Sequence, residues 1–266
     1  MMDLAALNVL LAPWLATGMG VMMRVAGMMF GMPLFIDGVM PPRVRSSLVV
    51  MMSLLLVLGV GPSVAAPANL VGWLLLLVPE LLVGLGLGVM LRVLFAVGSM
   101  MGQATSMMMG LGFATVLDPA SGGMSDNVGR IVRLLAVLVF IAVDGHVLAL
   151  RAVGDTLIAA PVGTFSLTDV SAASQSIAAQ GSLLFTLATR LAAPVIAGVL
   201  MVYTVLGVIA RVAPQMNLFA FGFVLTIPVG LYMLMMSMPQ LVLLFTSAFE
   251  QLPDRMLLWT TTGVAL

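Results

Sequence analysis

Residues 212–249 read VAPQMNLFAFGFVLTIPVGLYMLMMSMPQLVLLFTSAF, a run of 38 residues without one Asp, Glu, Lys or Arg. About 20 apolar residues cross a bilayer as an α-helix, so this run is long enough for a helical hairpin or for one very long helix. Pro228 and Pro239 lie inside the run, and each removes a backbone amide donor and favours a kink or a break. The run therefore predicts apolar helix that must be covered by something other than water.

The rest of the chain repeats this pattern of long uncharged runs. Of its 266 residues, 62% are hydrophobic and only 8% are charged, whereas about 25% are charged in an ordinary soluble domain. This composition argues against a disordered chain and against a soluble enzyme. The apolar residues do not alternate with polar ones, as they would in a membrane β-barrel. We therefore predict an all-α fold of membrane-associated helical hairpins in a single domain, residues 1–266. The further uncharged runs are 4–23, 46–79, 93–117, 170–189 and 191–210.

Clusters of Pro, Gly and Asp divide the chain into helical segments, because these residues mark turns. The clearest is Asp118-Pro119, followed by two glycines. We expect helices at about 4–34, 45–60, 69–102, 126–143, 145–159, 175–211 and 214–248.

The side-chain inventory excludes several kinds of site. The chain has no Cys and one His, which rules out a disulfide framework, a thiolate metal site and a His-rich zinc site. Its ten basic residues are all Arg and are balanced by ten acidic residues, so no basic field exists to hold nucleic acid. We expect no nucleic-acid partner, metal or cofactor. His146, in the sequence Asp144-Gly145-His146, could be a proton relay or a ligand, but we favour a helix-end residue.

Three charged residues fall within otherwise apolar segments: Glu80, Arg92 and Arg190. A charge at the bilayer centre costs at least about 2.5–3.5 kcal/mol, so we expect neighbouring subunits to supply their partners. Arg43 and Arg45 lie near the first joint and argue that this loop is cytoplasmic.

Glycines four residues apart also recur in the apolar segments. Such spacing lets membrane helices approach closely, although glycine is frequent enough here for chance to produce several pairs. We therefore favour close helix packing over a specific dimerisation face. The pairs are Gly27/Gly31, Gly84/Gly88 and Gly98/Gly102.

Three consecutive methionines, residues 107–109, stand directly before a glycine-broken apolar segment that ends at Asp118-Pro119. Methionine is flexible and fills irregular spaces, so most of the 25 methionines are expected to be core filling. An apolar loop at membrane depth is tolerated only where it is buried in protein or lines a cavity. The segment is therefore either a buried packing loop or part of a pore.

Residues 109–119 read MGLGFATVLDP, which closely resembles the signature of the FliR family of flagellar type III export gate proteins. Three further blocks resemble the family in order and spacing: PPRVR at 41–45, DGH at 144–146 and RVAPQMNLFAFGF at 211–223. Two departures are visible. Asp144 stands where the family commonly has Asn, and Val224 stands where Pro is frequent.

The resemblance implies a non-enzymatic channel or gate subunit that passes unfolded flagellar proteins. It further implies assembly with FliP- and FliQ-like subunits, alongside FlhB- and FlhA-like membrane proteins, and no cofactor. The place would be the flagellar basal body in the bacterial inner membrane, with the gate at the outer, periplasmic plane and in contact with lipid. Residues expected at subunit interfaces or as buried charges are Glu80, Arg92, Arg190, Arg211, Pro214, Gln215, Asn217 and Pro228.

We predict that residues 107–119 form a plug across the export path, since a hydrophobic constriction closes a pore by excluding water. Gly110 and Gly112 would give the backbone freedom to move, and Asp118-Pro119 would fix the far end in a turn. The alternative is a loop that only packs against a neighbouring subunit. The expected plug residues are Met107, Met108, Met109, Gly110, Leu111, Gly112, Phe113, Asp118 and Pro119.

Other functions remain open at this point. The injectisome homologue of the same gate subunit is the nearest alternative. A small multi-pass secondary transporter would use buried charges and Pro- or Gly-broken helices to bind a substrate near the midplane, although no inverted repeat supports it. An intramembrane enzyme would need a nucleophile and a base, and one His without any Cys offers few candidates.

Overall fold

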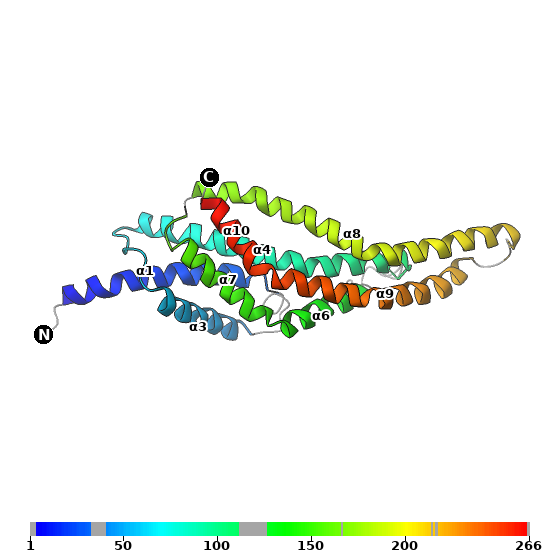
Figure 1. Ribbon diagram of the computed structural model, residues 1–266, viewed down its shortest axis with the longest axis horizontal. Helices are drawn as coiled ribbons and strands as arrows, with labels where there is room; N and C mark the ends of the chain where they lie inside the picture. Colours follow the sequence, from blue (N-terminus) through cyan, green and yellow to red (C-terminus); the bar gives the residue numbers. More distant parts are fainter. Residues whose placement is uncertain are drawn as a thin grey trace. The chain divides into compact units, whose positions relative to one another are not determined.

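The computed structural model describes residues 4–32, 41–111, 127–165, 167–213, 215 and 218–264. All regular secondary structure in these residues is helical, which confirms the predicted all-α fold (Figure 1). The helices are α1 (Leu4–Met29), α3 (Pro42–Val60), α4 (Leu70–Met108), α6 (Asn127–Ala142), α7 (Gly145–Ala159), α8 (Leu167–Val212), α9 (Leu218–Glu250) and α10 (Leu252–Val264).

Five of the described helices are long and apolar enough to cross a membrane: α1, α3, α4, α8 and α9. The number becomes six if α6 and α7 are counted together as one broken span. Length and composition of the helices are thus those of an all-α membrane protein.

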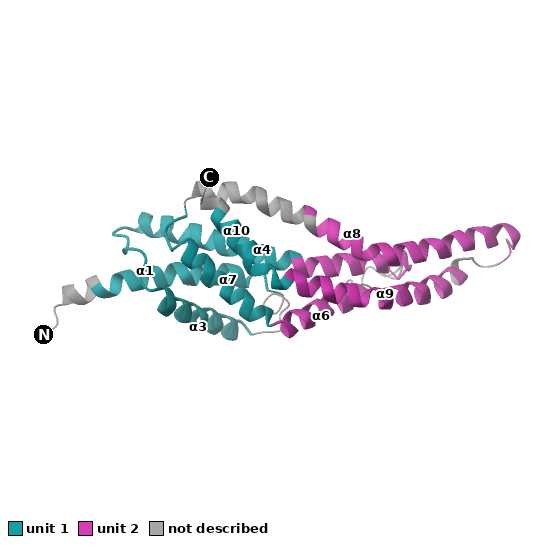
Figure 2. Ribbon diagram, viewed as in Figure 1, with its two compact units in different colours: residues 1–93, 144–181, 249–266 teal, residues 94–143, 182–248 magenta. Residues whose placement is uncertain are grey.

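The described helices pack as two compact units (Figure 2). Unit 1 comprises residues 1–93, 144–181 and 249–266, and unit 2 comprises residues 94–143 and 182–248. Helix α4 has its first part in unit 1 and its last part in unit 2, and the same is true of α8. The single domain of 266 residues stays a prediction.

Several predicted helix ends differ from the structure: α1 ends at Met29 instead of near residue 34, and α8 begins at Leu167 instead of near residue 175. The predicted segment 69–102 stops too early, because α4 continues to Met108. Gly102 does not end the helix. Its missing side chain instead lets α6 pack closely against α4, because a Cβ there would lie 2.6 Å from the backbone nitrogen of Gly129. Helix α10 was not predicted, although Pro253 and Asp254 in its first turn are typical of a helix start.

Two of the glycine pairs, Gly27/Gly31 and Gly84/Gly88, bring the end of α1 against α4 within unit 1. A Cβ on Gly27 would lie 2.6 Å from the backbone nitrogen of Leu85 and 2.7 Å from the carbonyl carbon of Gly84. A Cβ on Gly31, just after the end of α1, would lie even closer to the backbone of Gly88. The glycines therefore serve close helix packing inside the chain, the interpretation favoured from the sequence.

Candidate functional site

The predicted gate segment begins at the C-terminal end of α4, in unit 2. Met107 and Met108 form the last turn of this helix, with 64% and 38% of their surfaces exposed, whereas Met109 is completely buried. The predicted plug segment 107–119 therefore begins in the last helical turn of α4 and continues past the end of the helix. The remaining predicted plug residues Gly112, Phe113, Asp118 and Pro119 lie outside the described residues.

Gly110 ends α4, because its φ of +84° is a left-handed conformation that side chains other than glycine rarely adopt. The amide of Leu111 donates to the carbonyl oxygen of Ser106 at 3.1 Å, and the amide of Gly110 donates to that of Met107 at 3.0 Å. These two hydrogen bonds are those of a Schellman motif, which satisfies the last carbonyl groups of a helix. The local sequence thus fixes where the helix stops and the predicted gate segment begins.

Helices α8 and α9 hold this end of α4 through two hydroxyl groups. Tyr203 of α8 donates a hydrogen bond to the carbonyl oxygen of Met108, and Thr226 of α9 donates one to that of Met109, each at 2.9 Å. Thr226 is almost completely buried, so its hydrogen bond is shielded from water. The aromatic ring of Phe223 closes over Gly110, where it would be the first group met by an added Cβ.

Sequence reasoning missed these anchoring side chains. Tyr203 is one of only two tyrosines, and Thr226 is a hydroxyl residue inside the long uncharged run 212–249. A polar side chain within an apolar helix could have indicated such a contact, since a buried hydroxyl group needs a hydrogen-bond partner. Which partner it finds depends on the fold.

The second polar cluster lies in unit 1 and contains the predicted buried charge Glu80. Glu80 and Arg24 are both fully buried and form an ion pair. The Nε of Arg24 donates to Glu80 Oε2 at 2.7 Å, and Nη2 of Arg24 lies 2.6 Å from the same oxygen without making a hydrogen bond of its own. The expectation that a neighbouring subunit partners Glu80 was therefore wrong, because α1 supplies the partner.

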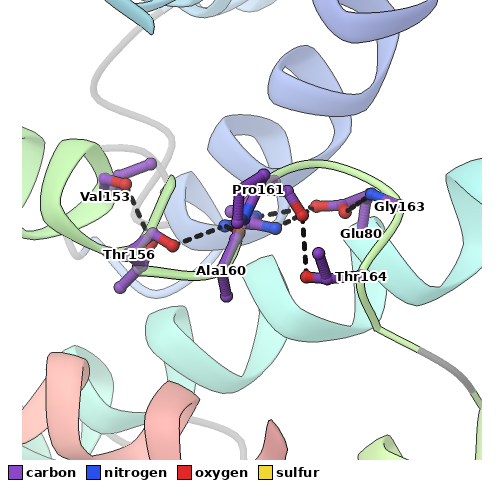
Figure 3. A network of polar contacts seen from close by, with 8 residues as sticks. Glu80, Val153, Thr156, Ala160, Pro161, Gly163 and Thr164 are labelled. Atoms are coloured by element: carbon purple, nitrogen blue, oxygen red, sulfur yellow. Dashed lines mark hydrogen bonds and ion pairs between the residues drawn. The ribbon is translucent and has the colours of Figure 1, made fainter. Parts of the chain in front are cut away.

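The same ion pair fastens the segment that follows α7 (Figure 3). Nη1 of Arg24 donates to the carbonyl oxygens of Thr156 and Ala160 at 3.2 and 3.1 Å, and the amide of Gly163 donates to Glu80 Oε1 at 2.9 Å. Arg24 thus satisfies the carbonyl group of Ala160, which the helix end leaves open, and adds a second hydrogen bond to that of Thr156, which already accepts from the amide of Ala160. One buried pair joins α1, α4 and the end of α7.

The other predicted charges lie at the surface of the described chain. Arg92, Arg190 and Arg211 are exposed, so in this chain none of them is a buried charge. Whether neighbouring subunits contact them stays a prediction. Gln215 lies exposed in a turn, and Pro228 lies inside α9. Pro214 and Asn217 are outside the described residues.

His146 is exposed in the first turn of α7, as expected of a helix-end residue. Asp144 before it adopts the left-handed conformation with φ 54°, which Asn and Asp tolerate better than other residues. In the part of the chain that the structure describes, no three His, Cys, Asp or Glu side chains gather in a way that could hold a metal ion.

The chain matches the family described as "Bacterial export proteins, family 1" over residues 15–252. Flagellar biosynthetic protein FliR of Escherichia coli strain K12 is 32% identical over 248 residues, which cover 91% of this chain and 93% of that protein. This chain belongs to the FliR family. FliR of Pectobacterium carotovorum is 30% identical over 245 residues, with the same coverage.

The FliR-family match includes both polar clusters, because Arg24, Glu80 and the end of α4 all lie within residues 15–252. A more distant relative is the surface presentation of antigens protein SpaR of Shigella flexneri, 26% identical over 205 residues, or 76% of this chain and 77% of that protein. The resemblance read from the sequence blocks is thereby confirmed.

Proposed function

We propose that this chain is the FliR-type component of a flagellar type III protein export apparatus in the bacterial inner membrane. The observation that carries the proposal is the similarity to proteins named FliR over 91% of the chain. The five long apolar helices support a position within a membrane. The chain acts as a non-enzymatic gate subunit at the outer, periplasmic side, through which unfolded flagellar proteins leave.

The exposed apolar surface supports assembly with FliP- and FliQ-like subunits, next to FlhB- and FlhA-like proteins. Large apolar side chains are exposed on both α3 and α9, and water does not solvate patches of this kind well. Lipid and neighbouring subunits would cover them. Examples are Leu54, Leu55, Leu58, Val224, Met235, Met236 and Leu243.

A deletion in the bacterium that carries this chain tests the role. Loss of the chain should abolish secretion of flagellar filament protein and motility, and re-expression should restore both. Copurification with mass measurement should then recover the chain with several copies of two other small membrane proteins. A deletion strain that still secretes filament protein would contradict the flagellar role.

The injectisome role is the second candidate, and the similarity to SpaR supports it. Shorter coverage and lower identity make it the weaker of the two. The same deletion separates them, because loss of an injectisome component would leave motility intact.

Within this role, residues 107–119 form the plug of the export path. The anchored end of α4 supports this, since Tyr203 and Thr226 hold one end of the segment while Met107 and Met108 present apolar surface. Gly110 supplies the sharp change of direction where the helix stops.

Resting ion conductance of the assembled complex tests the plug. Replacement of Met108 and Phe113 by Ser should leave the complex assembled and raise its conductance, because polar side chains wet a hydrophobic constriction. Met201→Ser, on an exposed methionine of α8, is the matched control and should change nothing. A complex that stays impermeable with both plug substitutions would place the seal elsewhere.

A further inference from the structure

A groove runs along α1 and α3 in unit 1. Its middle part, a cavity of about 290 Å³, lies between these helices and includes Met22, Phe30, Arg45 and Val50 in its wall. A second cavity of about 410 Å³ shares Met22 and Val50 with it and continues toward Leu58. A third, of about 360 Å³, shares Phe30 and Arg45 and reaches Arg92 on α4. Because neighbouring cavities share wall residues, the three adjoin in one line.

The wall of this groove is almost entirely apolar along α3. Leu54, Val57 and Leu58 line its far part together with Leu11 and Trp14 of α1. Ser53 is the polar side chain there, and its hydroxyl group already donates to the carbonyl oxygen of Val49 at 2.7 Å. Apart from Ser53 and the indole N–H of Trp14, the far part of the groove is lined by apolar side chains, so it suits a hydrocarbon chain.

Two guanidinium groups stand at the other end. Arg45 and Arg92 line the same cavity, and neither forms an ion pair or a hydrogen bond with the described part of the chain. The Nε of Arg45 is shielded from solvent and has no hydrogen-bond partner there. A buried donor of this kind is costly unless an acceptor reaches it, and a guanidinium matches the oxygens of a phosphate group.

We propose that this groove binds an anionic phospholipid, with the phosphate at Arg45 and Arg92 and one acyl chain lying along α1 and α3. The dimensions agree with this occupant. At about 1.5 Å per residue, α3 is about 20 Å long from Arg45 to Leu58, enough for a chain that crosses one leaflet of a hydrocarbon core about 30 Å thick. Arg45, near the start of the apolar helix α3, would also lie at the level of the lipid headgroups. The proposal does not depend on the export role.

Native mass spectrometry of the full chain in detergent, together with any subunits that copurify, tests the site. Phosphatidylglycerol and phosphatidylcholine with identical acyl chains are the probes. The wild-type chain should retain phosphatidylglycerol preferentially. The variant Arg45→Gln/Arg92→Gln should bind it at least about tenfold more weakly, because charge-assisted hydrogen bonds to the phosphate are lost. Phosphatidylcholine binding should change little.

Arg43→Gln is the matched control, since Arg43 is exposed on the same turn of α3 and lines none of these cavities. Val50→Trp fills the groove from a half-exposed position and should reduce retention of both lipids. The result for Val50→Trp tests whether lipid occupies the groove even if the double arginine variant fails to fold.

Any one of the following results would overturn the proposal. The wild-type chain shows no preference for the anionic lipid, or the preference survives the double arginine variant, or Val50→Trp leaves retention unchanged. A cross-link from Val50→Cys to a partner protein, with no lipid retained, would show that a protein side chain occupies the groove instead.

Discussion

Arg24 and Glu80 are 56 residues apart in the chain, yet the Nε of Arg24 lies 2.7 Å from Glu80 Oε2, with both side chains completely buried. Their three backbone partners, Thr156, Ala160 and Gly163, all belong to the end of α7 and the segment after it. The pair therefore stabilises an arrangement of three chain segments, and losing one partner would leave the other charge buried without compensation.

Glu80→Ala should destabilise the folded chain by about 3–5 kcal/mol, because the guanidinium of Arg24 would stay buried without its counter-ion. The measurement is thermal or denaturant unfolding of the chain in detergent, with any copurifying subunits. Arg151→Ala, at an exposed arginine of α7, is the control and should stay within about 0.5 kcal/mol of the wild type. Equal stability of Glu80→Ala and wild type would show that the pair contributes nothing.

Gly27→Ala should weaken the packing of α1 on α4 by about 1–3 kcal/mol, because the new methyl group would lie 2.6 Å from the backbone nitrogen of Leu85 and the helices would have to move apart. Gly207→Ala in α8 is the control, since nothing lies within 4 Å of a Cβ there. The control should be stabilised by up to about 1 kcal/mol through helix propensity. If both variants unfold alike, contact between the helices does not limit stability.

Uncharged runs and turn residues were enough to predict most of the helices and the all-α class. Helix ends were less predictable, because the same residue type acts differently in different surroundings. Gly102 lies within α4, where it faces Gly129, whereas Gly110 ends the helix with a positive φ. A sequence alone does not distinguish a glycine needed for close packing from one needed for a turn.

The candidate site was predicted only where its chemistry is local. The Met107–Met109 cluster and the glycine after it are adjacent in the sequence, so their joint position could be predicted. The partner of Glu80 could not, because it comes from a helix 56 residues away. For the same reason the hydroxyl groups that hold the end of α4 remained unrecognised.

Thr226→Val should destabilise the end of α4 by about 1–3 kcal/mol, since the buried carbonyl group of Met109 would lose its hydrogen-bond donor while the side-chain volume stays the same. If residues 107–119 form the plug, this variant should also raise the resting ion conductance of the assembled complex. Thr204→Val is the matched control, because the exposed Thr204 only donates to Leu200 within its own helix. If the control also raises the conductance, the leak does not depend on the hydrogen bond from Thr226 to the carbonyl oxygen of Met109.

Leu243→Asp should prevent assembly with partner subunits while the chain itself still folds. The side chain of Leu243 is 70% exposed on α9, so a carboxylate there lies outside the core of the chain and disturbs no internal packing. Burying this charge against an apolar partner surface would cost several kcal/mol, which is enough to lose a subunit contact.

Two other substitutions in α9 serve as comparisons for Leu243→Asp. Leu234 is only 4% exposed, and Leu234→Asp should instead prevent folding of the chain. Gln240→Glu adds a charge at an exposed polar position of the same helix and should assemble normally. Copurification of each variant with its partners, alongside size-exclusion chromatography of the chain, measures both effects. Normal recovery of partners with Leu243→Asp would show that Leu243 does not contact another subunit.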